Sequence, residues 1–263
     1  MTQRLESAMR AARRAGKILE NKFNTARTIK SKGKRDIVTD ADYAADRAVR
    51  RVIQSRFPRD YFLSEEDSKS ARAALWKRAN ADGAALWVVD PLDGTTNYAH
   101  HIPSFCVSLA LYRAGRVELG VVYDPLRDEM FAAERGAGAS LNGKPIHVSA
   151  TRAFQNAVIG MEYARDPKLR ARTVRVLRRV VARATSARAI GAAALSLCYV
   201  ARGRTDGYFH FSLSPWDVAA AACIVEEAGG RVTTPQGNAW SVHSRAFVVS
   251  NGALHAALLK CNK

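Results

Sequence analysis

The segment from Trp87 to Asn97, WVVDPLDGTTN, gathers the residues of this chain that are best suited to chemistry. A short apolar strand leads into Asp90 and Asp93, and the proline between them favours convergence of the two carboxylates where strand becomes loop. Two like charges repel unless a divalent cation with oxygen ligands relieves them. Gly94 and the threonines after it add N–H and hydroxyl groups that suit a phosphate or a nucleophilic water. The segment predicts a metal and phosphate site, although the same residue types are equally typical of a capped strand-to-helix turn.

Further carboxylates follow other predicted elements. The apolar strand YFLS ends in Glu65 and Glu66, and the next strong strand, residues 85–89, leads into Asp90. Two neighbouring strands that both end in acids would form one acidic pocket. Asp217 lies in the first turn of the helix in SPWDVAAAACIVEEAGG, where it either complements the helix dipole or reaches the same pocket from the second half of the chain.

Hydrophobic periodicity predicts the elements that position these acids. Helical spacing is found over residues 2–22, from Thr39 or Asp40 to near Pro58, over 167–184 and 192–202, and from Pro215 to Gly229. The segment after YFLSEED is predicted to be a polar loop. Short strands and turns over 105–148 indicate an antiparallel meander, and strands and helices alternate after residue 150. Helix capping alone is a sufficient explanation for Asp36, Asp40 and Asp42.

Length and composition favour a single domain or two closely packed halves, because 263 residues with 48% apolar content are enough for a substantial core. We expect an α+β half over residues 1–148, with the meander and most of the metal ligands, and an α/β half over residues 149–263 that supplies Asp217 and substrate-binding residues. The four cysteines are scattered without a CxxC pair, which predicts buried thiols rather than a zinc site or a disulfide framework.

The net charge of +17 is large enough to attract polyanions, and the Lys- and Arg-rich helix over 167–184 is the best candidate surface. The basic residues are spread along the chain without interleaved aromatics, so a solvated outer helix is the favoured interpretation and nucleic acid the less favoured partner. No stretch is long and apolar enough for a membrane span, and the N-terminus lacks a secretory apolar region, so we expect a soluble cytoplasmic protein.

Three motifs in order, SEED, WVVDPLDGTTN and SPWDVAAAACIVEEAGG, with DIVTDAD before them, resemble the inositol monophosphatase family of lithium-sensitive, magnesium-dependent phosphatases. The resemblance extends over nearly the whole chain, and the ordered set is specific where each motif alone is weak. It implies an α/β (α+β) fold built as a layered αβαβα sandwich with the site between the two halves. Lithium inhibition and a homodimer are implied by the resemblance alone.

Carried over position by position, the resemblance implies that Glu65, Asp90 and the carbonyl of Leu92 hold one Mg²⁺ ion. It implies that Asp90, Asp93 and Asp217 hold a second, and that a third, weaker ion lies near Glu65.

The resemblance also implies roles in catalysis and substrate binding. Thr95, paired with Glu65, would orient and deprotonate the attacking water, while Asp90 organises the metal ions. The implied substrate-binding residues are Asp93, Gly94, Thr95, Gly191, Ala192, Ala193, His210 and Asp217, and the accessory residues are Lys32, Asp42 and Glu66.

Two positions depart from the family pattern. His210 stands where inositol phosphatases usually have a glutamate that binds substrate hydroxyl groups, and Ala192 stands where a small hydroxyl residue is often found. A histidine can still donate or accept a hydrogen bond, but its charge and reach differ, and it is otherwise a tolerated strand residue. Inositol specificity is therefore in question, whereas hydrolysis is not.

Residue chemistry and resemblance agree on Mg²⁺-dependent hydrolysis of a small phosphate monoester such as an inositol monophosphate or a sugar phosphate. Because the ester is a dianion, metal ions are needed to neutralise its oxygens and to lower the pKa of the attacking water. Motifs of P-loop NTPases, zinc proteases and serine hydrolases are absent. Fructose 1,6-bisphosphate, histidinol phosphate and nucleotide phosphates remain alternative substrates, and binding of RNA or a transcription complex remains a second function.

Overall fold

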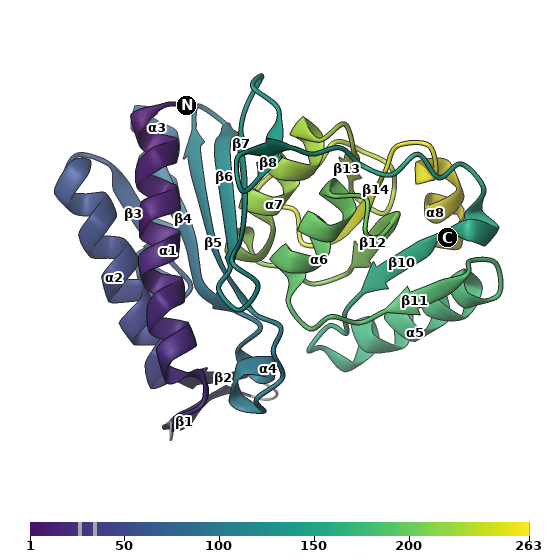
Figure 1. The fold of residues 1–263 in the computed structure, drawn as a ribbon, viewed down its shortest axis with the longest axis horizontal. Coiled ribbons are helices and arrows are strands. Elements are labelled where there is room, and N and C mark those ends of the chain that lie inside the picture. The colour runs from purple at the N-terminus through teal and green to yellow at the C-terminus, as the bar shows by residue number, and fades with distance from the viewer. Residues whose placement is uncertain (26–27, 34–35, 263) are drawn as a thin grey trace.

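The chain folds into five layers, which a computed structural model describes for residues 1–25, 28–33 and 36–262 (Figure 1). For residues 31–33 and 36 it describes the backbone alone. The longer helices are α1 (Gln3–Phe23), α2 (Asp40–Arg56), α3 (Lys69–Asp82), α5 (Pro167–Val181), α6 (Ala193–Ala201) and α7 (Pro215–Glu227). The shorter helices are α4 (Thr95–Ala99), α8 (His255–Cys261) and the 3-10 turn η1 (Phe154–Asn156).

Two large sheets alternate with the helical layers. The seven-stranded sheet has the order β3 (Tyr61–Ser64), β4 (Leu86–Asp93), β5 (Cys106–Arg113), β6 (Arg116–Asp124), β7 (Glu129–Glu134), β8 (Ala139–Leu141) and β9 (Lys144–Pro145). The five-stranded sheet has the order β11 (Ser186–Arg188), β10 (Val158–Met161), β12 (Gly207–His210), β14 (Phe247–Ser250) and β13 (Arg231–Thr233). A small ribbon pairs β1 (Ile29–Gly33) with β2 (Asp36–Thr39).

The layers follow from which faces of the helices are apolar. Helices α1 and α2 are amphipathic and cover the outer face of the seven-stranded sheet, while α5 and α8 cover the outer face of the five-stranded sheet (Figure 1). Helices α6 and α7 lie between the two sheets, where apolar side chains are needed on every side. The order is αβαβα, as predicted.

Small residues allow α7 to enter the central layer. The run from Ala219 to Ala222 is fully buried. Where α7 crosses β6, a Cβ atom added to Gly120 would lie 2.2 Å from the carbonyl oxygen of Ala220. Backbone therefore packs directly on backbone, which holds the N-terminus of α7 at a fixed place against the sheet.

Most predicted elements are present, and two differences have physical reasons. The segment predicted as a polar loop after YFLSEED forms α3, which begins at the cap Ser68, ends at left-handed Gly83 and buries only Ala79. A surface helix with so little apolar periodicity depends on capping and on Ala, Lys and Arg propensity, so the periodicity argument missed it. The short strands β11 and β13 were also missed, because three residues are too few to show alternation.

Two further expectations concern the cysteines and membrane spans. All four cysteines are buried free thiols, as predicted. No helix within the described residues is long and apolar enough to cross a membrane. The division of the chain at residue 148 stays a prediction.

Candidate active site

Two parallel strands deliver the first carboxylates to one edge of the seven-stranded sheet. Strands β3 and β4 pair in register with Ser64 opposite Val89, so Glu65 and Asp90 each follow a paired position. The Glu65 N–H donates to the carbonyl of Val89 at 3.1 Å, which holds the first residue after β3 against β4. Asp90 is buried, and its Oδ1 accepts the N–H of Leu92 at 3.0 Å. The predicted acidic edge is therefore formed by these two strands.

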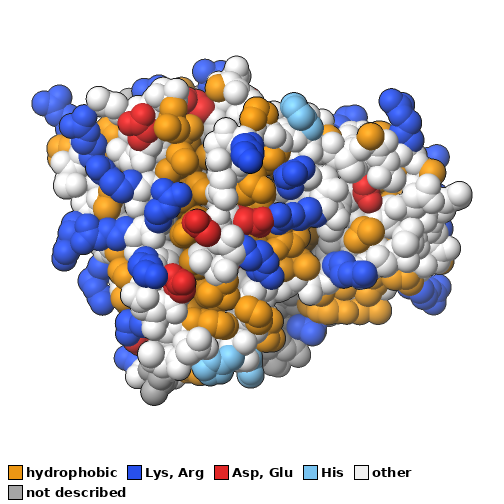
Figure 2. Space-filling model, in the orientation of Figure 1, with side chains coloured by type: hydrophobic (Ala, Val, Ile, Leu, Met, Phe, Trp, Pro, Cys, Tyr) orange, Lys and Arg blue, Asp and Glu red, His pale blue; other side chains and the backbone are white. Residues whose placement is uncertain are grey.

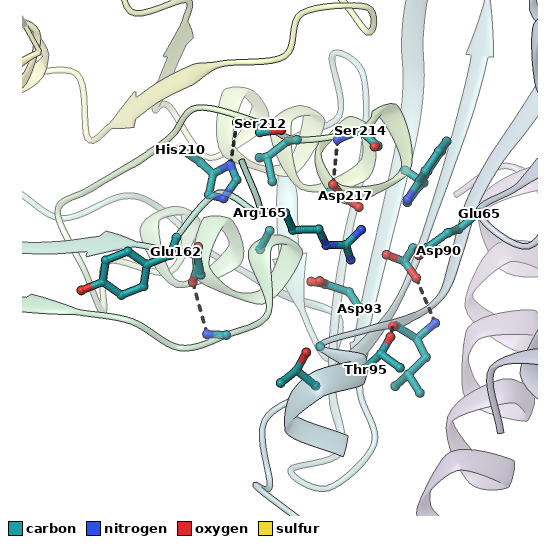
Figure 3. A pocket seen from close by; sticks show the side chains of 18 of the residues that line it. Glu65, Asp90, Asp93, Thr95, Glu162, Arg165, His210, Ser212, Ser214 and Asp217 are labelled. Atoms are coloured by element: carbon teal, nitrogen blue, oxygen red, sulfur yellow. Dashed lines mark hydrogen bonds between the residues drawn. The ribbon is translucent and has the colours of Figure 1, made fainter. Parts of the chain in front are cut away.

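Helix α7 brings the third carboxylate from the other half of the chain. Asp217 Oδ2 accepts the N–H of Ser214 at 2.7 Å across the first helical turn. The Trp216 carbonyl accepts from Ser108 Oγ of β5 at 3.1 Å, which fixes this end of α7 on the sheet. The side chains of Glu65, Asp90 and Asp217 converge in one cavity, where one oxygen of each lies within 4.8 Å of the others (Figure 3).

Asp93 lies beside this cluster and faces the start of α6. The register of β4 against β5 shifts between Asp90 and Asp93, so β4 continues to Asp93 with an irregularity where a tight turn was predicted. Asp93 Oδ2 accepts the N–H of Ala194 at 2.7 Å and contacts Cys106 Sγ at 3.6 Å. One oxygen of Asp93 is thus bound by the protein, which leaves the other oxygen for a metal ion.

Gly94 allows the sharp change from β4 into α4. Its φ is 95°, and a Cβ atom there would lie 2.9 Å from the Ser104 carbonyl oxygen and 3.2 Å from Ala192 Cβ. Only glycine has the conformation and the space for this position. The first residue of α4, Thr95, is thereby placed directly next to the carboxylate cluster (Figure 3).

Thr95 contacts an acid of α2. Its Oγ1 lies 3.2 Å from Asp42 Oδ1 and 3.0 Å from the carbonyl oxygen of Leu92, and its joint action with Glu65 on a water stays a prediction. Asp42 is buried and is fixed in turn by Thr39, whose N–H and hydroxyl donate to Oδ2 at 2.8 and 2.6 Å. Asp42, predicted as accessory, therefore contacts the site through Thr95, and its capping-box role is compatible with that contact.

A cavity of about 230 Å³ joins these residues to the C-terminal half. The predicted residues on its wall are Glu65, Asp90, Leu92, Asp93, Gly94, Thr95, Gly191, Ala193, His210 and Asp217. Asn97 ties the two halves together here, because its side-chain amide donates to the carbonyls of Ser104 and Ile190, each at 2.8 Å.

Four predicted residues are not among the described residues on that wall: Asp42, Ala192, Glu66 and Lys32. Ala192 is fully buried behind it as the residue preceding α6. Glu66 is partly buried next to Ser64 and is not among the described lining residues. The side chain of Lys32 lies outside the described residues, so its place near the site stays a prediction.

Sequence reasoning missed three charged lining residues: Glu162, Arg165 and Arg245. In Figure 3 the Arg165 guanidinium points into the space between Asp93 and Asp217, and Glu162 lies across the cavity from Asp90. A signal for Glu162 was available, because it follows the apolar strand β10 just as Glu65 follows β3. No comparable signal marks the two arginines in so basic a chain.

The electrostatics of the cavity suit a divalent cation. Burial, followed by repulsion from neighbouring carboxylates, raises the pKa of Asp90 and of Asp217 well above the usual range. Burial likewise raises the pKa of Asp93 to about 6. Several hard oxygen donors gathered in one cavity match the ligands that Mg²⁺ prefers. Glu65, Asp90 and Asp217 therefore fit such an ion.

The comparisons with known proteins agree with this geometry. The model of the inositol monophosphatase family matches residues 1–262. The chain belongs to the inositol monophosphatase family. It is 36% identical over 258 residues to the Nus factor SuhB of Salmonella typhimurium, covering 97% of this chain and 94% of that protein. It is 37% identical over 262 residues to inositol monophosphatase 2 of Solanum lycopersicum, covering 98% and 97%.

A solved structure of the same family shows the same fold. The extragenic suppressor protein suhB from Bartonella henselae matches with a TM-score of 0.93 at 34% identity, covering 100% of this chain and 99% of that one. The family and the fold class predicted from the motifs are confirmed.

Mg²⁺ is expected to stabilise this family member more at about pH 7.5 than at about pH 5. The raised pKa values of Asp90, Asp93 and Asp217 mean that the metal-free fold gains stability from their protonation at low pH and loses it as pH rises through about 6, the value for Asp93. Mg²⁺ binds the ionised carboxylates and removes that loss. Thermal unfolding with and without Mg²⁺ measures the difference, and each kcal/mol corresponds to roughly 2–4 °C in Tm.

Two buried histidines have pKa values shifted in the opposite direction. Their effect on stability is the same with and without Mg²⁺, so it cancels in the Mg²⁺-induced change in Tm. Burial lowers the pKa of His210 and of His255 to about 4, so each favours the folded state less as pH falls below about 6.5. Neither is a proposed metal ligand. An equal Mg²⁺-induced rise in Tm at both pH values would contradict metal binding by the raised carboxylates.

Proposed function

We propose that this protein hydrolyses a small phosphate monoester with Mg²⁺ by direct attack of water. The observation that carries the proposal is the convergence of Glu65, Asp90 and Asp217, whose ligand atoms lie within 4.8 Å of one another although they come from three distant segments. Bringing three carboxylates together in a cavity costs free energy through repulsion and burial. Divalent cations offset that cost and serve phosphoryl chemistry directly.

The metal ligands are proposed as two overlapping sets. Glu65, Asp90 and the Leu92 carbonyl would hold one ion, and Asp90, Asp93 and Asp217 a second, with a third and weaker ion near Glu65. When bound, Mg²⁺ neutralises phosphate oxygens and lowers the pKa of water. Asp90 belongs to both sets, and its burial against Leu92 fixes its orientation before any ion binds.

Thr95 and Asp42 are proposed to handle the proton of the attacking water. The Thr95 hydroxyl can donate to Asp42 Oδ1, which leaves its oxygen lone pairs to accept a hydrogen bond from water. Asp42 is a suitable final acceptor because Thr39 fixes its other oxygen. The backbone at Gly94, which carries no side chain, is proposed to donate to the phosphate together with the Thr95 N–H.

Phosphate release from a panel of esters tests the activity. The panel contains inositol, sugar, histidinol and nucleotide monophosphates and fructose 1,6-bisphosphate, each assayed with Mg²⁺ and with EDTA. We expect turnover of at least one ester that disappears with EDTA and returns on adding excess Mg²⁺. The 230 Å³ cavity favours the smaller esters, since pockets for drug-sized ligands have volumes of roughly 300–1,000 Å³. Turnover that survives EDTA would overturn the mechanism.

A second function, binding of RNA or of a transcription complex, is favoured by the net charge of +17 and by the similarity to a Nus factor. Figure 2 shows Lys and Arg side chains spread over one whole face rather than gathered in a stripe. On α5, Arg172 lies over the Phe211 ring at 4.2 Å, so part of this basic helix packs on the protein itself. Affinity for RNA that is insensitive to sequence and collapses between about 50 and 200 mM salt would identify charge alone as its cause.

A further inference from the structure

Arg72 of α3 contacts the backbone of one proposed metal ligand, and the proposed function leaves it without a role. It lies near the start of the helix and is partly buried. Its Nη1 donates to the carbonyl oxygen of Glu65 at 2.5 Å. The N–H of Glu65 donates in turn to the carbonyl of Val89 on β4. The backbone on both sides of the Glu65 side chain is therefore held, on one side by the sheet and on the other by α3.

The same guanidinium group contacts the other half of the chain. Arg72 Cζ lies 4.6 Å from the centroid of the Trp216 ring. Trp216 directly precedes Asp217 at the start of α7, and its carbonyl accepts from Ser108. Because a guanidinium group is planar, its edge can donate to a carbonyl oxygen while its face stacks on an aromatic ring. Arg72 thus joins the chain at Glu65 to the chain at Asp217.

A second side chain anchors α3 one turn after Arg72. The Trp76 ring lies 5.1 Å from the ring of Tyr112 on β5 and 4.8 Å from the ring of His243, which precedes β14, between ring centroids. Trp76 also packs against the apolar cluster between the two sheets. The helix is therefore fixed on both halves of the chain, and this fixes where the Arg72 guanidinium group lies.

The proposed metal ligands need such support because they repel one another. One oxygen each of Glu65, Asp90 and Asp217 lies within 4.8 Å of the others. The surrounding elements must hold these carboxylates together before an ion binds. Residues that hold metal ligands in place without contacting the ion typically change metal affinity about 10–100-fold when they are replaced. Arg72 is in the position to do this, because it contacts the segments that carry Glu65 and Asp217.

We propose that Arg72 is a positioning residue that raises the affinity of the site for divalent cations by holding Glu65 and the start of α7 in a fixed relation. This inference rests on the proposed function, because it uses the metal ligands proposed there. The arrangement that the ion needs is formed during folding, so less ordering is left for the binding step. Replacement of Arg72 leaves every ligand in the chain, and the ion binds the same residues more weakly.

Titration of Mn²⁺ into metal-free protein at about pH 7.5, where carboxylates can bind metal, tests the proposal without a substrate. The electron paramagnetic resonance signal of the free ion gives the dissociation constant. We compare wild type, Arg72→Ala and Arg72→Lys with the matched control Arg78→Ala. Arg78 also lies on α3, and its Cζ lies 4.8 Å from the ring centroid of Tyr61 on β3, so the control removes a similar contact away from Trp216.

The dissociation constant for Mn²⁺ is expected to rise roughly tenfold in Arg72→Ala and to stay within about twofold of wild type in Arg78→Ala. Alanine is a strong helix former, so both variants retain α3. Lysine keeps the charge but lacks the planar fork, and Arg72→Lys should show an intermediate loss. Wild-type affinity in either Arg72 variant would overturn the proposal.

Thermal unfolding without metal separates positioning from a purely structural role. A structural role predicts a lower Tm for Arg72→Ala with unchanged affinity for Mn²⁺, and that result would overturn the proposal. Trp216→Leu removes the other end of the same link. The loss of affinity in the double variant should therefore be clearly smaller than the product of the two single losses. Losses that multiply fully would overturn the link between Arg72 and Trp216.

Failure of this inference and failure of the proposed function give different results. If wild type binds no Mn²⁺, the metal ligands and the role of Arg72 are both wrong. If wild type and Arg72→Ala bind Mn²⁺ equally and ester hydrolysis requires Mg²⁺, only the role of Arg72 is wrong. Weaker Mn²⁺ binding by Arg72→Ala, in a protein that hydrolyses no ester of the panel, would support the role of Arg72 while the phosphatase activity fails.

Discussion

Replacement of Asp90 by asparagine is expected to lower Mg²⁺-dependent kcat/KM by roughly two decades or more. Asp90 is the acid that both proposed metal sets share, and it is almost fully buried between Glu65 and Asp217. An amide keeps the shape of the side chain but removes the charge that a divalent ion requires. Phosphate release at saturating ester across a Mg²⁺ titration measures the effect.

The matched control for that variant is Asp166→Asn. Asp166 caps α5 through the N–H groups of Lys168 and Leu169, is exposed, and is replaced by a residue that caps helices equally well. It should leave turnover within about twofold of wild type. Activity of Asp90→Asn equal to that of this control, at the same Mg²⁺ concentration, would exclude Asp90 as a shared ligand.

Thr95→Ala is expected to lower kcat by about two decades with little change in KM. The proposal uses the Thr95 hydroxyl to pass a proton toward Asp42, and positioned proton transfer contributes about 10² to 10⁴ in rate. Thr95→Ser keeps the hydroxyl and should retain most of the activity. Comparison of kcat for the two variants is the measurement.

Replacement of Asp42 tests the same proton path from Thr95 to Asp42. Asp42→Asn should reduce kcat in a similar range, and the loss in Thr95→Ala combined with Asp42→Asn should be far smaller than the product of the two single losses, because both changes break one path. Losses that multiply fully would assign Thr95 and Asp42 independent roles.

The carboxylate cluster was predictable because its signals are local. Glu65 and Asp90 each follow an apolar strand, and adjacent parallel strands end at one edge of a sheet. Asp217 was recognisable as an acid in the first turn of a helix that is apolar on every side. Such a helix must lie between two layers, so its start is expected at an edge where the halves meet. These patterns indicated the central acids, whereas the layered fold was implied by the resemblance to the family.

The remaining parts of the site depend on contacts that a single sequence does not encode locally. The link from Thr95 to Asp42 spans 53 positions, and helix capping had already given Asp42 a sufficient explanation. Glu162 follows an apolar strand, which is a local signal, but its place beside the end of β12 depends on the register of β10 and β12. The helix α3 was missed because its apolar side chains contribute so little burial.

The most direct test of the central claim, that the buried carboxylates hold catalytic divalent ions, is a crystal structure of the protein with Mn²⁺ in place of Mg²⁺. Anomalous scattering locates Mn²⁺ without reference to the activity. We expect one peak among Glu65, Asp90 and the Leu92 carbonyl, and a second among Asp90, Asp93 and Asp217, with ligand distances close to those of small hard cations. Absence of any peak at Asp90 in crystals of a preparation that hydrolyses its ester with Mn²⁺ would contradict the account.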